Sequence, residues 1–330
     1  MKAIILAGGE GRRLRSVTGG ALPKPMVSIA GKPVLEYLLL NLRRNNITEI
    51  CITLRTLPEV ITGYFKNGDD LGLSLHYRIE SAALGTAGSV ASCRDFVGDE
   101  DFLVCCGDAL LDCELEPLMD CHRKNKAVAT LGLYESAVPL SFGLCLTDAR
   151  NRVCAFVEKP RWEQVITNRI NTGIYVFSPE IFDYIPKNMP YDIGSQLLPA
   201  LLRQGKKLCA LPLEGYWRDI GEGESYYRAN LDVLNGRLPH FAPPQEQRSE
   251  TAPPSHRYPC AVRLRTADAA RLMAALCANM MEAGADFTDG LSAKGVHIAP
   301  RSGKEVLVEA QDEPTAEHYA SLCRELEGER

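Results

Sequence analysis

The first 25 residues contain the feature that most restricts the fold of this chain. Ala3 to Ala7 is an unbroken apolar run, and Gly8, Gly9 and Gly11 follow it directly. An apolar run without alternation is typical of a strand covered on both faces, as in a parallel sheet. Glycine permits unusual backbone conformations and leaves main-chain N–H groups open to an anion. We therefore expect a buried strand that ends in an anion-binding turn.

Two cationic side chains, Arg13 and Lys24, follow this turn. Arginine offers a rigid fork of donors and lysine a compact charge, and Pro23 and Pro25 restrict the backbone around Lys24. Both standard glycine signatures are absent, because G-x-G-x-x-G would need glycine at Leu14 and no G-x-x-x-x-G-K-[ST] loop occurs. A tight turn with solvated basic residues is the alternative, and a lysine between two prolines argues against it. We predict that these cations bind phosphate groups.

Strand and helix patterns alternate along the first 235 residues. Strands are expected at 49–54, 73–78 and 102–106, and helices at 33–45 and 58–65. Such alternation predicts an α/β fold: a Rossmann-like, mainly parallel sheet flanked by helices. Ligands bind such sheets beyond the carboxyl ends of the strands, where the polar motifs of this chain lie.

Two carboxylates stand out as candidate ligands for a hard divalent cation. Asp108 follows an apolar run and Gly107, and Asp219 lies in the segment Gly215 to Gly221, beside Trp217. An aspartate after a strand is more often a turn residue or a helix cap. Two carboxylates from the two halves of the chain could instead share one magnesium ion.

Three further polar segments follow predicted strands. They are Leu84-Gly85-Thr86-Ala87-Gly88, Glu158-Lys159-Pro160 and Asn171-Thr172-Gly173. Each segment also has a purely structural interpretation. The first could be a flexible helix start, the second a pair of surface charges before a proline, and the third a loop shaped by Asn and Gly.

Taken in order, these motifs resemble those of the sugar-1-phosphate nucleotidylyltransferases. The family signature L-A-G-G-x-G-T-R-L, followed by P-K-P, is similar to residues 6–14 and 23–25, with Arg12 in place of Thr. The resemblance covers about residues 1–236 and implies the nucleotidyltransferase fold. It places the following residues at the nucleotide and its transferred phosphate: Leu6, Ala7, Gly8, Gly9, Gly11, Arg13, Lys24, Gly85 and Thr86.

The same resemblance implies roles for the remaining motifs. Glu158 and Asn171 would bind sugar hydroxyls, Lys159 the sugar phosphate, and Gly143 would lie close to the sugar ring. The G-D and W-x-D-I-G motifs of the family supply two metal-binding aspartates, here Asp108 and Asp219, for Mg²⁺. A sugar-1-phosphate oxygen would then attack the α-phosphorus of a nucleoside triphosphate and release pyrophosphate.

Composition restricts the partners and the compartment. The 330 residues carry a formal charge of only -5, which argues against a nucleic-acid partner held by a broad basic surface. No apolar run approaches the roughly 20 residues of a membrane span, and no signal-peptide pattern is present, so we expect no membrane partner and a cytoplasmic protein. The 12 cysteines form no C-x-x-C pair and are expected to be reduced core thiols.

Residues 237–258 are rich in proline and read as a linker to a small α+β domain at 259–330. We expect strands near 261–264, 295–298 and 305–310, and helices at 267–283 and after Pro314. Asp289-Gly290, Arg301-Ser302-Gly303 and Val308-Glu309-Ala310 resemble the C-terminal domain of phosphohexomutases such as phosphomannomutase. A packing or oligomerisation role is favoured over phosphosugar sensing, and mutase activity is not expected.

The favoured substrates are GTP and mannose-1-phosphate, because the combined resemblances are most similar to mannose-1-phosphate guanylyltransferases. Glucose-1-phosphate with another nucleoside triphosphate is the first alternative. A catalytically weak regulator that binds nucleotide sugars is the second, suggested by Arg12, Glu222 and the shortened mutase-like segment. The sequence leaves the nucleobase, the sugar and homo-oligomerisation open.

Overall fold

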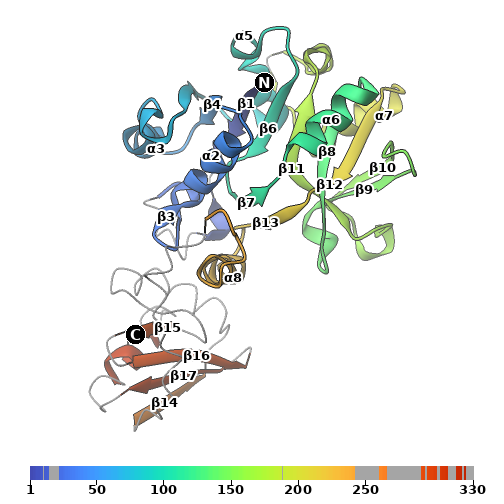
Figure 1. Cartoon of the computed structure of the whole chain (residues 1–330). Helices are drawn as coiled ribbons and strands as arrows, with labels where there is room; N and C mark the ends of the chain where they lie inside the picture. The colour runs from blue at the N-terminus through green and yellow to red at the C-terminus, as the bar shows by residue number, and fades with distance from the viewer. Residues whose placement is uncertain are drawn as a thin grey trace. The chain divides into compact units, whose positions relative to one another are not determined.

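The fold is described from a computed structural model of the chain (Figure 1). The described residues are 1–9, 11–14, 22–187, 189–241, 260–265, 291–293, 296–302, 305–310, 317–321 and 323–324. The chain divides into two compact units, the first formed by residues 1–10 and 35–217 and the second by residues 11–34 and 218–330.

The first unit is organised around a strand with parallel neighbours on both sides. β1 (Lys2–Leu6) lies between β4 (Glu49–Leu54) and β6 (Phe102–Cys106), and β5 (Ser74–Ile79) extends the sheet beyond β4 in the same direction. Ala3, Ile4 and Ile5 are fully buried, so both faces of β1 are covered. This confirms the buried, parallel strand expected from the apolar run.

The other half of the sheet is mixed, with mostly antiparallel pairs. β11 (Arg169–Phe177) runs antiparallel to β6, to β8 (Ala129–Glu135) and to β9 (Gly143–Thr147). β10 (Val153–Glu158) pairs with β9, and β12 (Leu208–Pro212) pairs in parallel with β8. In the described part of the chain, nine strands form this one sheet, in which β6, β1, β4 and β5 make the parallel portion.

Helices and a separate strand pair complete the first unit (Figure 1). The helices are α2 (Val34–Arg44), α3 (Pro58–Phe65), α4 (Gly85–Ala91), α5 (Arg94–Val97), α6 (Glu116–Asn125) and α7 (Leu198–Arg203). Residues of α4 and α7, such as Val90 and Leu201, join Ile4 and Phe177 in one buried apolar cluster. β7 (Ala109–Cys113) pairs with β13 (Gly215–Asp219). The predicted α/β fold is confirmed.

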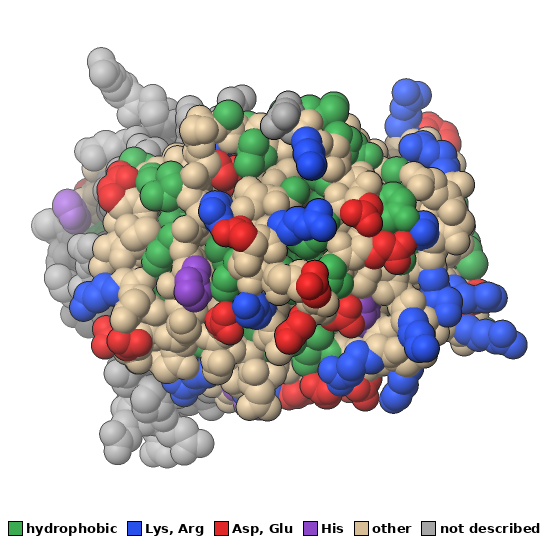
Figure 2. Space-filling model, turned by 90° about the horizontal axis from the view of Figure 1, so that it is seen from above, with side chains coloured by type: hydrophobic (Ala, Val, Ile, Leu, Met, Phe, Trp, Pro, Cys, Tyr) green, Lys and Arg blue, Asp and Glu red, His purple; other side chains and the backbone are tan. Residues whose placement is uncertain are grey.

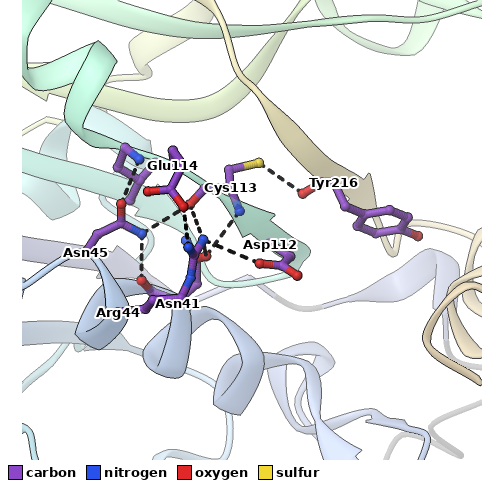
Figure 3. Close-up of polar contacts among 8 residues, drawn as sticks. Asn41, Arg44, Asn45, Asp112, Cys113, Glu114 and Tyr216 are labelled. Atoms are coloured by element: carbon purple, nitrogen blue, oxygen red, sulfur yellow. Dashed lines mark hydrogen bonds and ion pairs between the residues drawn. The ribbon is translucent and has the colours of Figure 1, made fainter. Parts of the chain in front are cut away.

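A polar cluster attaches the end of α2 to β7 (Figure 3). The Arg44 guanidinium donates to the Cys113 carbonyl at 2.9 Å and to Asp112 at 3.4 Å, and it also pairs with Glu114. Asn45 donates to the same carbonyl at 3.1 Å. Because Asp112 is nearly fully buried, its charge is compensated by Arg44 rather than by water.

The second unit contains a short strand pair and a helix. β2 (Ser28–Ile29) and β3 (Lys32–Pro33) form a hairpin, and the Ala30 N–H within it donates to the Asn230 side chain of α8 (Gly223–Leu234) at 2.9 Å. Short 3₁₀ turns cover Arg12–Leu14 and Lys24–Met26.

A four-stranded antiparallel sheet lies in the C-terminal part of the second unit. Its order is β14 (Cys260–Arg265), β17 (Glu305–Ala310), β16 (Val296–Ser302) and β15 (Leu291–Ala293). The three predicted strands are therefore present. The helix expected at 267–283, the Asp289-Gly290 and Gly303 positions and most of the linker lie outside the described residues.

The visible surface mixes charges of both signs. On the face in Figure 2, acidic and basic side chains alternate over most of the area, with a few basic ones together at one edge. None of the described helices has the length and apolar character needed to cross a bilayer.

His122 gives the fold a testable pH dependence. Its ring is 1% exposed, 2.9 Å from the Thr130 hydroxyl and 3.7 Å from Asp101. Burial lowers the pKa of His122, and Asp101 opposes this shift only in part. Since the folded state resists protonation, the unfolded chain binds the proton more readily, and stability falls as the pH drops below about 6.5.

We therefore predict that the free energy of unfolding of the wild type, measured with urea, falls between pH 7.5 and 5.5 by up to about 1.4 kcal/mol per pH unit. His122→Gln should have a lower free energy of unfolding at pH 7.5, but that free energy should fall less on acidification. His76→Gln, at an exposed position, should show the same free energy of unfolding and the same pH dependence as the wild type. An equal pH slope in wild type and His122→Gln would contradict the assignment.

Candidate active site

The glycine turn leaves the sheet at the carboxyl end of β1. The Ala7 N–H donates to the Thr53 carbonyl at 3.0 Å, so pairing with the β4 side continues one residue past β1. The Gly107 N–H donates to the Leu6 carbonyl at 2.9 Å on the β6 side. Leu6, Ala7, Gly8 and Gly9 therefore lie at the centre of the carboxyl edge of the parallel strands, where ligands bind in such sheets.

Asp108 lies at the same edge. It follows Gly107, whose close approach to β1 depends on the lack of a side chain, because a Cβ there would lie 3.0 Å from Ile5 Cγ2 and 3.2 Å from the Leu6 carbonyl oxygen. The predicted carboxylate is thus placed beside the start of the glycine turn by main-chain contacts.

Glu80 is a further carboxylate at this edge, and the sequence motifs did not identify it. It follows β5, is 8% exposed, and its Oε2 lies 3.5 Å from the position a Cβ would take on Gly8. Its Oε1 is buried without a hydrogen-bond partner among the described residues. Burial raises the pKa of Glu80, against the opposing effects of Ser89, Thr53 and Arg55. A buried carboxylate oxygen without a hydrogen-bond partner is uncommon in folded proteins, and Glu80 lies beside the glycine turn.

The Leu84–Gly88 segment is held by a second segment about 105 residues later in the chain. The Ala87 and Gly88 N–H groups donate to the Tyr191 carbonyl at 2.9 and 3.1 Å, and the Tyr191 N–H donates to the Leu84 carbonyl at 2.8 Å. Gly85 has a φ of +71°, and a Cβ on it would lie 2.5 Å from the Tyr191 carbonyl oxygen. Glycine is therefore required at this position for two separate reasons.

The Thr86 hydroxyl joins the same two segments. It donates to Asp192 Oδ2 at 2.8 Å and accepts the Ile193 N–H at 2.8 Å. Asp192 also accepts from the Ser195 N–H at 2.9 Å and from the Ser195 hydroxyl at 3.0 Å. Burial alone would raise the pKa of Asp192, but these hydrogen bonds outweigh it and the pKa is lowered. Asp192 therefore favours the ionised form.

Glu158, at the end of β10, is surrounded by glycines. A Cβ on Gly143 would lie 2.7 Å from Glu158 Oε2, and a Cβ on Gly194 would lie 2.5 Å from the same oxygen. Burial raises the pKa of Glu158, the charge of Lys159 lowers it and Asp192 raises it further. Gly143 and Gly194 thus provide the space that this half-buried carboxyl occupies. Gly143 was predicted as a site residue and Gly194 was not.

The other residues of these motifs have distinct local geometry. Lys159 is exposed and has a φ of +43°, a left-handed conformation that is uncommon for a side chain of its type. Asn171 donates to the Tyr175 hydroxyl at 2.7 Å and accepts the Gly173 N–H at 3.3 Å, within an irregularity of β11. A Cβ on Gly173 would lie 2.7 Å from Cys106 Sγ, so the close approach of this motif to β6 also requires glycine.

The second unit contains its own group of predicted residues. Lys24 Nζ lies 3.4 Å from Asp219 Oδ1, with Lys24 only 9% exposed. Arg13 Nη1 lies 3.4 Å from Glu222 Oε1, and both of these side chains are largely exposed. A Cβ on Gly11 would lie 3.0 Å from Lys24 Cβ, which explains glycine there. The structure thus brings together the predicted cations Arg13 and Lys24 with the predicted metal ligand Asp219.

Substitution of Gly85 tests the packing of its segment. Gly98 is a matched control, because it also has a φ of +71° but no atom within 4 Å of an added Cβ. We predict that Gly98→Ala lowers the free energy of unfolding by about 1–3 kcal/mol, through backbone strain alone. Gly85→Ala should lower the free energy of unfolding by at least about 2 kcal/mol more than Gly98→Ala does, because the added Cβ overlaps Tyr191. Urea unfolding measures both, and equal losses would contradict the packing described here.

Comparison with known proteins places this site in context. The family model of nucleotidyl transferases matches residues 2–236. A UTP–glucose-1-phosphate uridylyltransferase of Synechocystis is 38% identical over 253 residues, covering 72% of this chain and 64% of that protein. A mannose-1-phosphate guanylyltransferase of Mycobacterium tuberculosis is 37% identical over 238 residues, covering 72% of this chain and 66% of that protein. The matches therefore span a little under two thirds of each relative.

Solved structures agree with the fold. A protein assigned as a glucose-1-phosphate thymidylyltransferase from Bacillus anthracis superposes with a TM-score of 0.63 at 28% identity, covering 70% of this chain and 94% of that one. HddC from Yersinia pseudotuberculosis gives a TM-score of 0.59 at 28% identity, covering 69% of this chain and 97% of that one. With the matched family model and the shared sheet, this chain belongs to the nucleotidyl transferase family.

Proposed function

We propose that this protein transfers a nucleotidyl group from a nucleoside triphosphate to a sugar-1-phosphate, with GTP and mannose-1-phosphate as the favoured pair. The observation that supports this most strongly is the grouping of polar motifs in the first unit. Gly8, Glu80 and Asp108 follow the carboxyl ends of neighbouring parallel strands, and the Gly143, Glu158 and Gly194 contacts adjoin the segment that binds Leu84–Gly88.

Charge determines the chemistry of such a transfer. The sugar-1-phosphate oxygen attacks the α-phosphorus while the bond to pyrophosphate breaks, so two anions must first be brought together. In this proposal Arg13 and Lys24 stabilise charge on the triphosphate, and Lys159 positions the attacking phosphate. No protein nucleophile is needed, and the phosphate is largely ionised near neutral pH, so a general base is unnecessary as well.

Asp108 and Asp219 are proposed to hold Mg²⁺. Carboxylate oxygens suit this hard cation, which commonly takes one or two carboxylates and completes its ligands from substrate phosphates and water. The described residues contain no group of three or more acidic, His or Cys side chains placed to hold a metal ion by themselves. That fits a metal whose remaining ligands come from the substrate. The ion would neutralise charge on the α-phosphate.

The preference for guanine is supported by Glu80. Guanine presents two adjacent donors, N1–H and the N2 amino group, which match the two oxygens of one carboxylate. Uracil presents a single N–H between two carbonyl oxygens, which a carboxylate would repel. Glu80 lies beside the glycine turn, with its Oε2 3.5 Å from the position of a Cβ on Gly8, and a carboxylate at this position favours guanine over uracil.

Two alternatives retain specific support. The uridylyltransferase relative favours glucose-1-phosphate with UTP, and its identity to this chain is similar to that of the guanylyltransferase. The contact between Arg13 and Glu222 favours a catalytically weak nucleotide-sugar-binding protein, because that carboxylate competes with a triphosphate for the guanidinium.

We also propose a cytoplasmic location.

Removing either proposed metal ligand tests the reaction. We predict that Asp108→Ala and Asp219→Ala each lower kcat by at least about 10³-fold, measured as pyrophosphate release, because charge on the α-phosphate is no longer neutralised. Circular dichroism should stay close to the wild type in both variants, and Tm should fall only in Asp219→Ala, which removes an ion-pair partner of the buried Lys24. Asp120→Ala, a surface carboxylate of α6, should retain full activity. Near-normal rates in both site variants would refute the metal assignment.

Glu80→Gln tests the nucleobase assignment. The amide keeps one acceptor and gains a donor, so it loses one guanine hydrogen bond and gains a match to a uracil carbonyl. We predict that kcat/KM with GTP falls about 10²-fold and that the ratio of GTP to UTP activity falls further. Glu59→Gln, an exposed residue of α3, is the control. A wild type that prefers UTP, measured across a panel of nucleotides and sugar phosphates, would favour the uridylyl alternative.

A further inference from the structure

The Thr86 hydroxyl is directed into the protein's own backbone. Its proton is donated to Asp192 at 2.8 Å and one lone pair accepts the Ile193 N–H at 2.8 Å. A threonine that served only as a nucleotide contact would not need to bind a segment more than 100 residues away. Two hydrogen bonds from one side chain instead fix the position of the Tyr191–Ile193 segment relative to the Leu84–Gly88 segment.

The main chain reinforces this connection. Ala87 and Gly88 donate to Tyr191, and Tyr191 donates to Leu84. The lack of a Cβ on Gly85 allows the two backbones to lie against each other. A shift of either segment therefore breaks several hydrogen bonds or moves the other segment with it.

The second segment leads directly to Glu158. Gly194 follows Ile193, and a Cβ on it would lie 2.5 Å from Glu158 Oε2, so the backbone of Gly194 forms one wall of the space for this carboxyl. Residues Ile193–Leu197 wind as a π-helix, a rare form that occurs frequently at functional sites. Asp192 caps this turn, and its charge also acts on Glu158. The position of Glu158 thus depends on the Asp192–Gly194 backbone.

We propose that the Thr86–Asp192 hydrogen bond couples the two substrate sites, so that bound nucleotide tightens the binding of the sugar-1-phosphate, and that Asp192 is a positioning residue that acts through Gly194 on Glu158. This inference rests on the proposed function. A nucleotide that orders the Leu84–Gly88 segment also orders Tyr191–Gly194, and the sugar phosphate then binds to a Glu158 that is already held in place. By thermodynamic linkage, the sugar phosphate must tighten nucleotide binding by the same factor.

A purely local role for Asp192 is the competing explanation. As a helix cap it would stabilise its own turn by about 1 kcal/mol and have no effect on the linkage between ligands. Two control variants separate these roles. Ser195→Ala removes a hydroxyl from the same Asp192 carboxylate and leaves Thr86 in place. Thr130→Val makes the same chemical change as Thr86→Val at a buried hydrogen bond to His122.

The test is calorimetric titration of the full chain with mannose-1-phosphate, with and without a saturating GTP analogue whose α and β phosphorus atoms are joined by a methylene group. Each ligand is first titrated alone. For the wild type we expect mannose-1-phosphate to bind about tenfold more tightly when the analogue is present. Thr86→Val and Asp192→Asn should reduce this ratio to between one and two.

The conservative and control variants complete the design. Thr86→Ser keeps the hydroxyl and should restore the wild-type ratio, and Ser195→Ala and Thr130→Val should keep it even where they lower Tm. A wild-type ratio of one while both ligands bind, or an unchanged ratio in folded Thr86→Val or Asp192→Asn, would overturn the coupling alone. Failure of both ligands to bind the wild type would overturn the proposed function and the coupling with it.

Discussion

The pairing of β1 with a parallel strand on each side is the constraint on which the candidate site depends. Parallel neighbours place the carboxyl ends of β1, β4, β5 and β6 at one edge of the sheet. The next residues of the chain are then close in space even though they lie far apart in sequence. Gly8, Glu80 and Asp108 lie at this edge for that reason.

Glycine has two separate uses in this unit. At Gly9 no described atom occupies the space that a side chain would take, which leaves the backbone uncovered. At Gly85, Gly143 and Gly194 it lets one part of the protein approach another, either a backbone or the Glu158 carboxyl. A sequence motif does not distinguish these two uses of glycine. The structure separates them, because a Cβ on Gly9 would meet no atom within 4 Å, whereas a Cβ on Gly85 would overlap Tyr191.

The local elements were predictable from the sequence, and the long-range contacts were not. The strands at 49–54 and 102–106 and the helix at 58–65 have the predicted bounds, because their apolar patterns and turn residues are local signals. The antiparallel insertion of β11 beside β6 has no such signal, since register depends on residues distant in sequence. Glu80 and Asp192 were missed for the same reason, because a carboxylate becomes informative only once its burial and partners are known.

Three carboxylates of the first unit, Asp192, Glu158 and Glu80, differ in how hydrogen bonds and burial act on them. Asp192 accepts hydrogen bonds from Thr86 and from Ser195, and its pKa is lowered despite burial. Burial raises the pKa of Glu158 and of Glu80 instead. A carboxylate whose oxygens already accept hydrogen bonds from the protein, such as Asp192, stabilises the contacts between segments. Among the described residues, one oxygen of Glu80 lacks a hydrogen-bond partner, and a carboxylate with fewer donors gains more from a group that brings N–H or O–H donors. These three acids therefore differ in role: Asp192 maintains the local geometry through its hydrogen bonds, whereas burial of Glu80 and Glu158 favours their neutral form.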